Sequence, residues 1–354
     1  MKKILSDTEH MIRRAELDYL RDQFWKVDAL DVIKTNSAVM TSMLKKIQSV
    51  ASTKAIVLFS GETGTGKGVM AHLLHRHSNR AGESFISVHC GAIPDTLLES
   101  ELFGHEKGAF TGATRKKLGK FEIAASGTIF LDEVGTITPT AQIKLLQVLQ
   151  DGTFSRVGGE KTIVTDARII VATNADLKAM AADGRFRKDL YYRLNVFPIE
   201  IPPLRDRKED ITYLANLFLE RFDQKYQKQI TSIHPIVLEA MRRYDWPGNV
   251  RELENLIERA YILTIEKIIM PQSFPSEVMG DTEQIEFPAV VKETTLTEAR
   301  RVVIESFEAQ YIKDVLAKHS GRINKSADAA GIGVRQFHKL MQKYNIRKDR
   351  FNKD

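Results

Sequence analysis

Two hydrophobic patterns alternate along roughly the first two hundred residues. Short runs rich in β-branched residues, such as 55–61 (AIVLFSG) and 127–134 (GTIFLDEV), have the length and composition of buried strands. Between such runs lie stretches such as 67–77 (KGVMAHLLHRH), whose apolar residues recur at helical spacing. Strands that alternate with helices predict an α/β fold with a mostly parallel sheet over residues 27–200.

A purely helical pattern follows the α/β region. It predicts helices near residues 208–226, 235–243 and 249–263, with Asn249 as the N-cap of the third. We therefore assign residues 201–270 to an all-α subdomain that accompanies the sheet.

Two segments lack the pattern of a domain. Residues 1–26 read as one polar helical segment, which is too short to bury a core of its own. Residues 271–294 hold three prolines and little periodicity, which predicts a linker.

The C-terminal domain, residues 295–354, is predicted to be all helical. A capping box (Thr-x-x-Glu) opens a long amphipathic helix over residues 295–318. Two short helices follow, residues 325–330 with Asn324 as the N-cap and residues 334–344, and a glycine turn separates them. Two short helices around a tight turn are typical of a helix-turn-helix.

Composition narrows the class of protein. The chain is 43% hydrophobic and 28% charged, as an ordinary soluble chain is. No apolar run approaches the roughly 18 residues of a membrane helix, and residues 1–10 lack the apolar core of a signal peptide. The single cysteine, Cys90, excludes a disulfide framework. We therefore expect a cytoplasmic protein with no membrane contact.

The formal net charge of +6 is concentrated at the C-terminal end. Residues 320–354 hold nine Lys or Arg against three Asp or Glu, so the rest of the chain is balanced. This distribution favours a polyanion as the partner of the C-terminal domain. Charge alone leaves open a merely solvated helical surface.

A phosphate-binding loop lies between a predicted strand and a predicted helix. The motif GETGTGKG lets backbone N–H groups surround phosphates, while Lys67 meets the β/γ charge. The candidate nucleotide-binding residues are Gly61, Glu62, Thr63, Gly64, Thr65, Gly66, Lys67 and Gly68. Gly68 occupies the position where a Ser or Thr usually binds Mg²⁺, so the metal needs another ligand.

Two acids at the end of the strand 127–134 supply that ligand. Asp132 is expected to hold Mg²⁺, directly or through water, and Glu133 to orient and deprotonate the attacking water. Acids at this place can also cap the next helix. The next predicted strand ends in Thr173 and Asn174, and Asn174 is a candidate to position the same water.

Three arginines are candidates to stabilise charge at the phosphates. Arg187 and Arg193 are expected to act from a neighbouring subunit, and Arg251 from the helical subdomain. For any single arginine, a surface ion pair is the alternative.

Four stretches carry a family resemblance: 92–113 (AIPDTLLESELFGHEKGAFTGA), 119–135 (GKFEIAASGTIFLDEVG), 186–211 (FRKDLYYRLNVFPIEIPPLRDRKEDI) and 246–260 (WPGNVRELENLIERA). On these motifs the chain resembles the bacterial sigma-54-dependent activators, or enhancer-binding proteins, which are AAA+ ATPases. The resemblance covers roughly residues 30–265, and the end of the chain is similar to a Fis-type helix-turn-helix. GAFTGA distinguishes this family from other AAA+ proteins.

The resemblance implies a hexameric ring that uses ATP and Mg²⁺, with a helical lid and with Arg187 or Arg193 as the trans-acting finger. It places Val32 and Ile33 near the adenine. It also implies a loop that contacts sigma-54 in the RNA polymerase holoenzyme: Gly108, Ala109, Phe110, Thr111, Gly112 and Ala113. Glycines at both sides of Phe110 suit a flexible tip that shows an aromatic ring to solvent. The alternative is that Phe110 folds into the core.

The chain departs from the family pattern at three places. Gly68 replaces a glutamate, and Ile33-Lys34-Thr35 replaces an Ile-Ile-Gly segment near the adenine. His89 stands where the family has an asparagine that is thought to relay the state of the γ-phosphate to Glu133. Elsewhere, His72 and His75 share a helix face, which we expect to be a solvated surface without a metal.

The last predicted helix has the chemistry of a recognition helix in the major groove. Its inward residues at helical spacing are Phe337, Leu340, Met341 and Tyr344. The base-edge candidates are Arg335, Gln336 and Lys339, and the phosphate candidates are Arg322, Lys343, Arg347 and Lys348. A stripe of Val303, Phe307 and Tyr311 on the preceding helix is expected to pair two such domains.

These observations predict an ATP-hydrolysing transcription activator. It would bind upstream double-stranded DNA as a dimer, assemble a ring and remodel sigma-54 polymerase. The alternative is a nucleotide-gated DNA-binding regulator with little turnover, because of Gly68 and His89. Since only some 26 residues precede the ATPase region, we expect no receiver domain in this chain and no control by phosphorylation in cis.

Overall fold

The computed structural model describes residues 34–279, 295–319, 321–344 and 346. The described residues fall into two compact units, one within residues 1–280 and one within residues 281–354. The helix that we predict within residues 1–26 lies outside the described residues.

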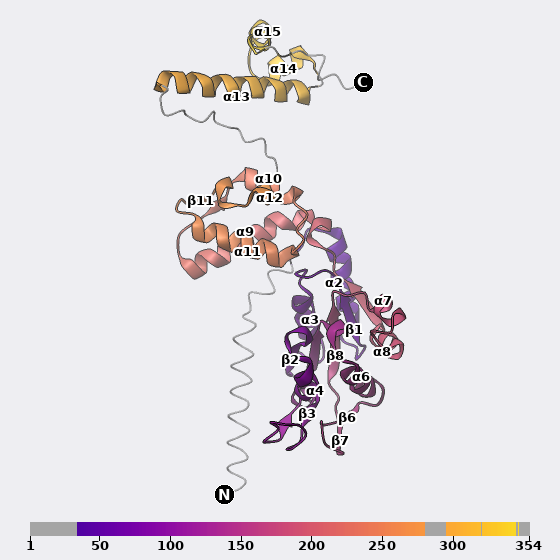
Figure 1. The fold of residues 1–354 in the computed structure, drawn as a ribbon. Coiled ribbons are helices and arrows are strands. Elements are labelled where there is room, and N and C mark those ends of the chain that lie inside the picture. Colours follow the sequence, from indigo (N-terminus) through magenta and orange to yellow (C-terminus); the bar gives the residue numbers. More distant parts are fainter. Residues whose placement is uncertain (1–33, 280–294, 320, 345, 347–354) are drawn as a thin grey trace. The chain divides into compact units, whose positions relative to one another are not determined.

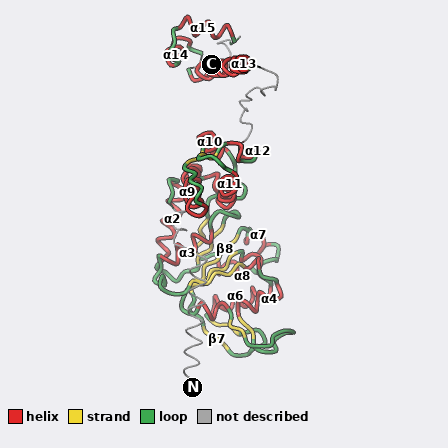
Figure 2. Tube along the Cα trace, turned by 90° about the vertical axis from the view of Figure 1, so that its left-hand side faces the viewer, coloured by secondary structure: helices red, strands yellow, loops and turns green. Residues whose placement is uncertain are grey.

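Five parallel strands form the central sheet of the first unit (Figures 1 and 2). Their order is β2 (Phe85–His89), β5 (Thr128–Asp132), β8 (Arg168–Thr173), β1 (Val57–Ser60) and β9 (Phe197–Glu200). All six residues of β8 are buried, as expected of a central strand covered on both faces. The predicted α/β fold with a parallel sheet is confirmed.

Helices cover both faces of this sheet. They are α2 (Ala38–Ala51), α3 (Lys67–Arg76), α4 (Asp95–Phe103), α5 (Lys120–Ala124), α6 (Pro139–Asp151), α7 (Leu177–Ala182) and α8 (Lys188–Leu194). Alternate strand residues point to opposite faces, so β8 contributes to two separate cores. Ile169 and Val171 pack with the α4 and α6 side, whereas Ile170 and Ala172 pack with α2 and α3.

Two short hairpins extend from the sheet. One consists of β3 (Gly104–His105) and β4 (Lys117–Leu118), and the other of β6 (Thr153–Ser155) and β7 (Thr162–Val164). Backbone hydrogen bonds join them, since Glu106 N donates to Val157 O at 3.1 Å and Val157 N donates to Gly104 O at 2.9 Å. The GAFTGA motif lies in the loop that joins β3 to β4, and these bonds hold the start of that loop against the residues that follow β6.

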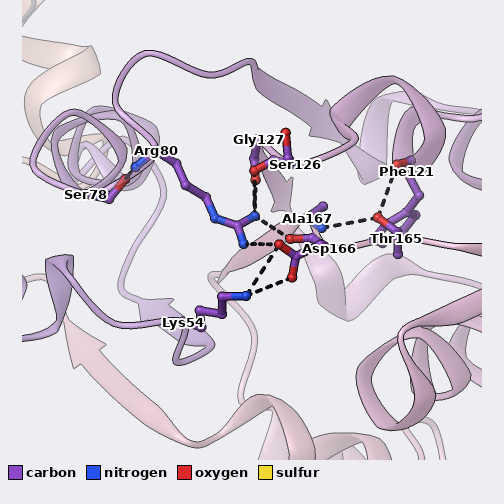
Figure 3. A network of polar contacts seen from close by, with 9 residues as sticks. All are labelled: Lys54, Ser78, Arg80, Phe121, Ser126, Gly127, Thr165, Asp166 and Ala167. Carbon is purple, nitrogen blue, oxygen red and sulfur yellow. Dashed lines mark hydrogen bonds and ion pairs between the residues drawn. The ribbon is translucent and has the colours of Figure 1, made fainter.

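A polar network ties together the segments that enter the strands (Figure 3). The Arg80 guanidinium donates to the carbonyls of Ser126 and Gly127 and pairs with the Asp166 carboxylate at 2.8 Å. Lys54 Nζ lies 3.1 Å from the same carboxylate, and its hydrogen bond is the main cause that lowers the pKa of Asp166. These residues precede β1, β5 and β8, so the network lies at the amino ends of the strands.

The rest of the first unit is a lid of helices. It consists of α9 (Lys208–Tyr226), α10 (Pro235–Arg243), α11 (Asn249–Leu263) and α12 (Ser276–Met279), with the short strands β10 (Ser232–Ile233) and β11 (Ile268–Ile269). The first unit also has short 3-10 turns. Cys90–Ala92 follows β2 and Val134–Thr136 follows β5, whereas Leu204–Asp206 and Pro271–Ser273 lie next to the lid helices. The helices predicted near 208–226, 235–243 and 249–263 are confirmed. Trp246, Phe218 and Tyr261 are fully or almost fully buried in the core of the lid.

Two predictions about the lid are wrong in detail. Residues 271–279 are predicted as linker, but Phe274 and Val278 are buried in the lid core, because these two apolar side chains, four positions apart, pack against the other lid residues despite the prolines. Asn249 is not the N-cap of α11; Gly248 holds that position, and the Asn249 side chain is fully buried in other hydrogen bonds.

The second unit contains α13 (Leu296–Lys318), α14 (Ile323–Ala329) and α15 (Val334–Lys343). Thr295 caps α13, since its Oγ1 accepts from Glu298 N at 3.4 Å. α14 begins two residues earlier than predicted, so Arg322 and not Asn324 is its N-cap. Helices α13, α14 and α15 enclose a small core of Ile312, Leu316, Ala327, Phe337, Met341 and Ile346. Leu340 and Tyr344 pack against it, so the predicted inward face is confirmed.

Candidate functional site

The phosphate-binding loop joins β1 to α3. Gly64 and Gly66 have φ of 80° and 101°, the left-handed conformation that glycine adopts without strain. Lys67 is only 8% exposed, and its Nζ donates to the carbonyls of Gly61 and Glu62 at 2.9 Å each. The ammonium group therefore lies within the loop that would surround the phosphates.

Asp132 is the last residue of β5, and Glu133 follows it. Burial lowers the pKa of Lys67, and the charges of Asp132 and Glu133 oppose that effect. Asp132 Oδ1 accepts from Glu133 N at 2.9 Å, and Glu133 has a left-handed φ of 55°. A Cβ atom at Gly91 would lie 2.2 Å from Glu133 Oε2, so a side chain at this position would make the carboxylate move.

His89 lies next to both carboxylates because β2 pairs with β5 in register, with His89 opposite Asp132. Its Nδ1 is 3.9 Å from Asp132 Oδ2, and its Nε2 is 3.8 Å from Glu133 Oε2. Both distances exceed a direct hydrogen bond. The imidazole is close enough to bond either acid after a small side-chain shift.

Asn174, at the end of β8, connects the sheet to the loop. Its Nδ2 donates to Thr63 Oγ1 at 3.1 Å. Thr173 is 2% exposed and its Oγ1 accepts from Ala175 N at 3.0 Å, so it serves the local turn. Asn174 is exposed and remains the candidate that lies at the loop.

The three candidate arginines lie in different surroundings. Arg187 forms an exposed ion pair with Asp189 at 2.7 Å, and Arg193 Nε donates to Leu149 O at 3.2 Å. Arg251 is brought to the loop, since its backbone N donates to Gly64 O at 3.4 Å and its charge adds to the lowering of the Lys67 pKa. Arg251 also lines a pocket of about 460 Å³ that includes Thr63.

Glu62 faces the lid. Arg205 Nη1 and Nη2 donate to the two oxygens of its carboxylate at 2.8 and 2.5 Å, and Asn249 Nδ2 donates at 3.1 Å. These hydrogen bonds, that of Arg205 foremost, lower the pKa of Glu62 to about 2. The sequence analysis did not single out Arg205. The sequence did contain a signal for such a partner. Glu62 places a negative charge in a loop that binds phosphates, and a nearby cation would offset that charge.

The loop Gly108–Ala113 is a closed turn with an outward tip. Gly108 N donates to Ala113 O at 2.8 Å, and Ala113 N donates to Phe110 O at 3.0 Å. Phe110 is 38% exposed and its ring packs edge-on against His105, 5.0 Å away, rather than in the core. Thr111 beside it is exposed.

A buried arginine that the sequence analysis missed supports this loop. Arg156 Nη1 donates to Glu106 Oε1 at 2.6 Å, and its Nε donates to Glu122 Oε1 at 2.8 Å. Ala109 fits against Gly158, where a Cβ atom would lie 2.7 Å from the Ala109 methyl group. The loop that joins β6 to β7 therefore packs against the loop Gly108–Ala113.

The start of the described chain lies beside α9. Thr35 Oγ1 donates to the Asp210 carboxylate at 2.7 Å, and Asn36 N donates to it at 2.8 Å. Val32 and Ile33, predicted near the adenine, lie outside the described residues.

The expectation for His75 is wrong, because α3 turns this side chain toward the sheet. His75 is 4% exposed, and its Nδ1 lies 2.9 Å from Thr128 Oγ1. Burial lowers its pKa to about 4. Over the described residues, no group of three or more His, Cys, Asp or Glu side chains is arranged to hold a metal ion.

The second unit presents most of the predicted DNA-contact residues to solvent. Arg335, Gln336 and Lys339 are exposed on α15, and Arg322 is exposed at the start of α14. Lys343 is also exposed, but its Nζ lies 3.4 Å from Glu305 and 3.7 Å from Glu308, so acids of α13 already offset its charge. Arg347 and Lys348 lie outside the described residues.

Helix α13 carries an exposed apolar face. Ile304, Phe307 and Tyr311 are 46%, 66% and 41% exposed, and the rings of Phe307 and Tyr311 stack 6.1 Å apart. The side chain of Val303 lies outside the described residues. None of the helices that the structure describes is both long and apolar enough to cross a membrane.

Three sequence-family models match the chain. They describe the sigma-54 interaction domain over residues 33–200, the AAA+ ATPase lid domain over residues 205–288 and the Fis family of bacterial regulatory proteins over residues 303–344. The lid match continues past residue 271, in agreement with the position of α12.

Relatives match across these regions. The regulatory protein AtoC of Escherichia coli (strain K12) is 44% identical over 317 residues, which are 89% of this chain and 68% of AtoC. The nitrogen fixation protein VnfA of Azotobacter vinelandii is 42% identical over 347 residues, 97% of this chain and 64% of VnfA. The chain thus spans about two thirds of each relative.

Solved structures agree with this relationship. The crystal structure of NtrX from Brucella abortus in complex with ATP is 30% identical, with a TM-score of 0.65, and the match covers 96% of this chain and 74% of that one. The same protein in complex with ADP also has a TM-score of 0.65. From the matching domains, the AtoC relationship and the loop Gly108–Ala113, we conclude that the chain belongs to the sigma-54-dependent transcriptional activators, which are AAA+ ATPases.

Proposed function

We propose that this protein hydrolyses ATP to remodel sigma-54 RNA polymerase in the cytoplasm from an upstream site on double-stranded DNA. One observation carries the proposal: Lys67, Asp132, Glu133 and Asn174 converge on one phosphate-binding loop in the same unit that bears the exposed loop Gly108–Ala113. A hydrolytic centre and a contact loop in one folded unit suit a motor that acts on a protein.

The residues at the loop divide the work of hydrolysis. Lys67 and the N–H groups of residues 61–68 bind the phosphates. Glu133 takes the proton of the attacking water, and Asn174 orients that water beside Thr63. Burial of Lys67 strengthens its attraction to phosphate, because the local dielectric constant is low.

The donor set fits Mg²⁺. Mg²⁺ in nucleotide sites takes one or two carboxylates together with phosphate oxygens and water. Asp132 offers an oxygen ligand at the end of β5, whereas Gly68 has no side chain to offer. When bound, Mg²⁺ neutralises phosphate charge.

A ring of subunits accounts for the exposed arginines. Within its own subunit, Arg187 pairs with Asp189, and Arg193 Nε donates to Leu149 O. In a hexameric ring, an arginine on one subunit reaches the phosphates of the next and stabilises the charge of the transition state. Arg251 acts within its own subunit from α11.

The second unit provides sequence-specific DNA binding. Arg335, Gln336 and Lys339 read base edges in the major groove, and Arg322 binds phosphate. The face of Ile304, Phe307 and Tyr311 pairs two copies, which matches a two-fold DNA site.

The second candidate function is a nucleotide-gated DNA-binding regulator with little turnover. It is favoured by His89, which lies within 3.9 Å of both Asp132 and Glu133 and can occupy their hydrogen-bonding capacity. Steady ATPase activity of the purified protein separates the two candidates.

Open-complex formation tests the first candidate as a whole. Purified sigma-54 holoenzyme on a linear promoter should form a heparin-resistant complex only when this protein and ATP are both present. A complex that forms equally with a non-hydrolysable ATP analogue contradicts the proposal. Holoenzyme with the main vegetative sigma factor is the control and should show no response.

A further inference from the structure

The P-loop of this protein carries an acid that points to the lid. Arg205 holds both oxygens of Glu62, at 2.8 and 2.5 Å, in the bidentate geometry that gives strong and specific ion pairs. Asn249 Nδ2 adds a third bond at 3.1 Å. We call Glu62, Arg205 and Asn249 the clasp.

Asn249 joins three segments that are distant in sequence. Its side chain donates to Glu62 and to Thr63 O at 3.0 Å, and it accepts from Leu204 N at 2.8 Å. Asn249 is fully buried and has a φ of 53°, a conformation that costs a non-glycine residue energy. The surrounding hydrogen bonds offset that cost, so the position of Asn249 is tightly determined.

The backbone of α11 starts directly on the P-loop. Gly64 O accepts from Val250 N at 3.0 Å and from Arg251 N at 3.4 Å, so a P-loop carbonyl satisfies N–H groups of the first turn of α11. A Cβ atom on Gly64 would lie 2.2 Å from Gly248 O. The loop and the helix therefore leave each other almost no freedom at this point.

Nucleotide binding must change the bonds of this same loop. Lys67 Nζ rests on the carbonyls of Gly61 and Glu62, and it has to turn from them to meet a phosphate. Glu62 thus bonds the phosphate-binding lysine through its carbonyl and the lid through its carboxylate.

We propose that the clasp couples phosphate occupancy of the P-loop to the position of α11, and so positions Arg251 for hydrolysis. Glu62 and Arg205 are positioning residues, whose side chains act through Arg251 and do not contact the nucleotide. The inference rests on the proposed ATPase activity.

A double-mutant cycle tests the coupling. Arg205→Ala should lower kcat for ATP about tenfold and change the Kd for ADP by less than about threefold. In an Arg251→Ala background, Arg205→Ala should have almost no further effect on kcat, because both changes remove one function. Additive effects on kcat would overturn the proposal, and so would a loss of ADP affinity as large as the loss of kcat.

A control variant lies on the same helix. Glu254 pairs with Arg221 of α9 at 3.2 Å, away from the P-loop. Glu254→Ala should leave kcat within about twofold of the parent. If Arg205→Ala does not fold, Glu62→Gln replaces it, since the neutral amide keeps the shape and removes the charge. A fall in kcat with Glu254→Ala as large as that with Arg205→Ala would mean that any loss of lid stability suffices.

Trp246 provides a readout that is independent of turnover. It is fully buried three residues before Asn249, and its Nε1 donates to Met241 O at 2.8 Å. In a Trp25→Phe background, Trp246 is the single tryptophan of the chain. ADP should shift its emission in the parent, and the shift should vanish in Arg205→Ala although ADP still binds. A full shift in Arg205→Ala would overturn the clasp. If the parent does not hydrolyse ATP, the proposed function fails, whereas the Trp246 response still tests the clasp.

Discussion

His89 Nε2 lies 3.8 Å from Glu133 Oε2, with Nδ1 of the same ring 3.9 Å from Asp132 Oδ2. A single side chain thus stands beside the proposed base and the proposed metal ligand. The parallel register of β2 and β5 produces this arrangement, since it sets His89 directly opposite Asp132. Whatever moves His89 also changes the surroundings of Glu133.

Glu133→Gln should abolish turnover and keep nucleotide binding. The amide cannot accept the proton of the attacking water, so kcat should fall by about 100-fold or more, whereas the Kd for ATP should change little. Steady-state kinetics and equilibrium binding measure the two quantities. Glu239→Gln, at an exposed ion pair on α10, is the control and should hydrolyse ATP at the parent rate. Parent-like turnover by Glu133→Gln would remove this residue from the role of base.

Mixing two inactive variants tests whether sites are shared between subunits. Glu133→Gln inactivates the ATPase site of the subunit that carries it, whereas Arg187→Ala or Arg193→Ala inactivates the ATPase site of the next subunit. Mixed rings should therefore contain some intact sites and recover part of the ATPase activity. The activity is measured across mixing ratios at constant total protein. A flat line at the level of the separate variants would argue against a trans-acting arginine.

Changes in the loop Gly108–Ala113 should separate hydrolysis from activation. Phe110→Ala and Thr111→Ala remove exposed side chains at the tip, so ATPase activity should stay within about twofold of the parent. Open-complex formation with sigma-54 polymerase should be lost. Thr114→Ala, exposed just outside the loop, should retain both activities. Normal activation by Phe110→Ala and Thr111→Ala would refute the contact role.

Arg335→Ala should relax DNA specificity at one base pair. Loss of a base-edge contact costs about 1–3 kcal/mol against the preferred base and leaves other positions unchanged. Arg322→Ala should instead weaken binding to all sequences alike and reduce the salt dependence. Lys343→Ala should have a smaller effect, because Glu305 and Glu308 already offset its charge. Binding titrations on single-base variants at several salt concentrations distinguish these outcomes.

His75 should make stability depend on pH. Its pKa is about 4 in the folded protein, below the ordinary 6.5, because burial disfavours the charged ring. The unfolded chain binds the proton more readily, so stability is complete above pH 6.5 and is lost as the pH falls toward 4. Between pH 6.5 and 5 the loss should be about 2 kcal/mol. Urea unfolding at both pH values should show this difference in the parent and a smaller one in His75→Gln. Equal losses would show that other groups cause it.

Much of the fold and of the site was predictable from local pattern. Strand and helix periods are set by neighbouring residues, so the strand that ends in Asp132 and the helices near 208–226, 235–243 and 249–263 could be predicted. The P-loop is likewise one continuous segment whose glycines and lysine carry their own geometry. In a parallel sheet, strand ends meet at one edge, which brings Asp132 and Asn174 near Lys67.

Only the tertiary structure decided which partners distant residues find. Glu62 pairs with Arg205, which lies 143 positions further along the chain. The local pattern favours Asn249 as an N-cap, but its side chain instead forms three hydrogen bonds with the P-loop and Leu204. The helical pattern around His75 does not indicate that the sheet covers the face of α3 on which this side chain lies. Local sequence determines the period of an element, whereas burial and ion pairing depend on the surface that it packs against.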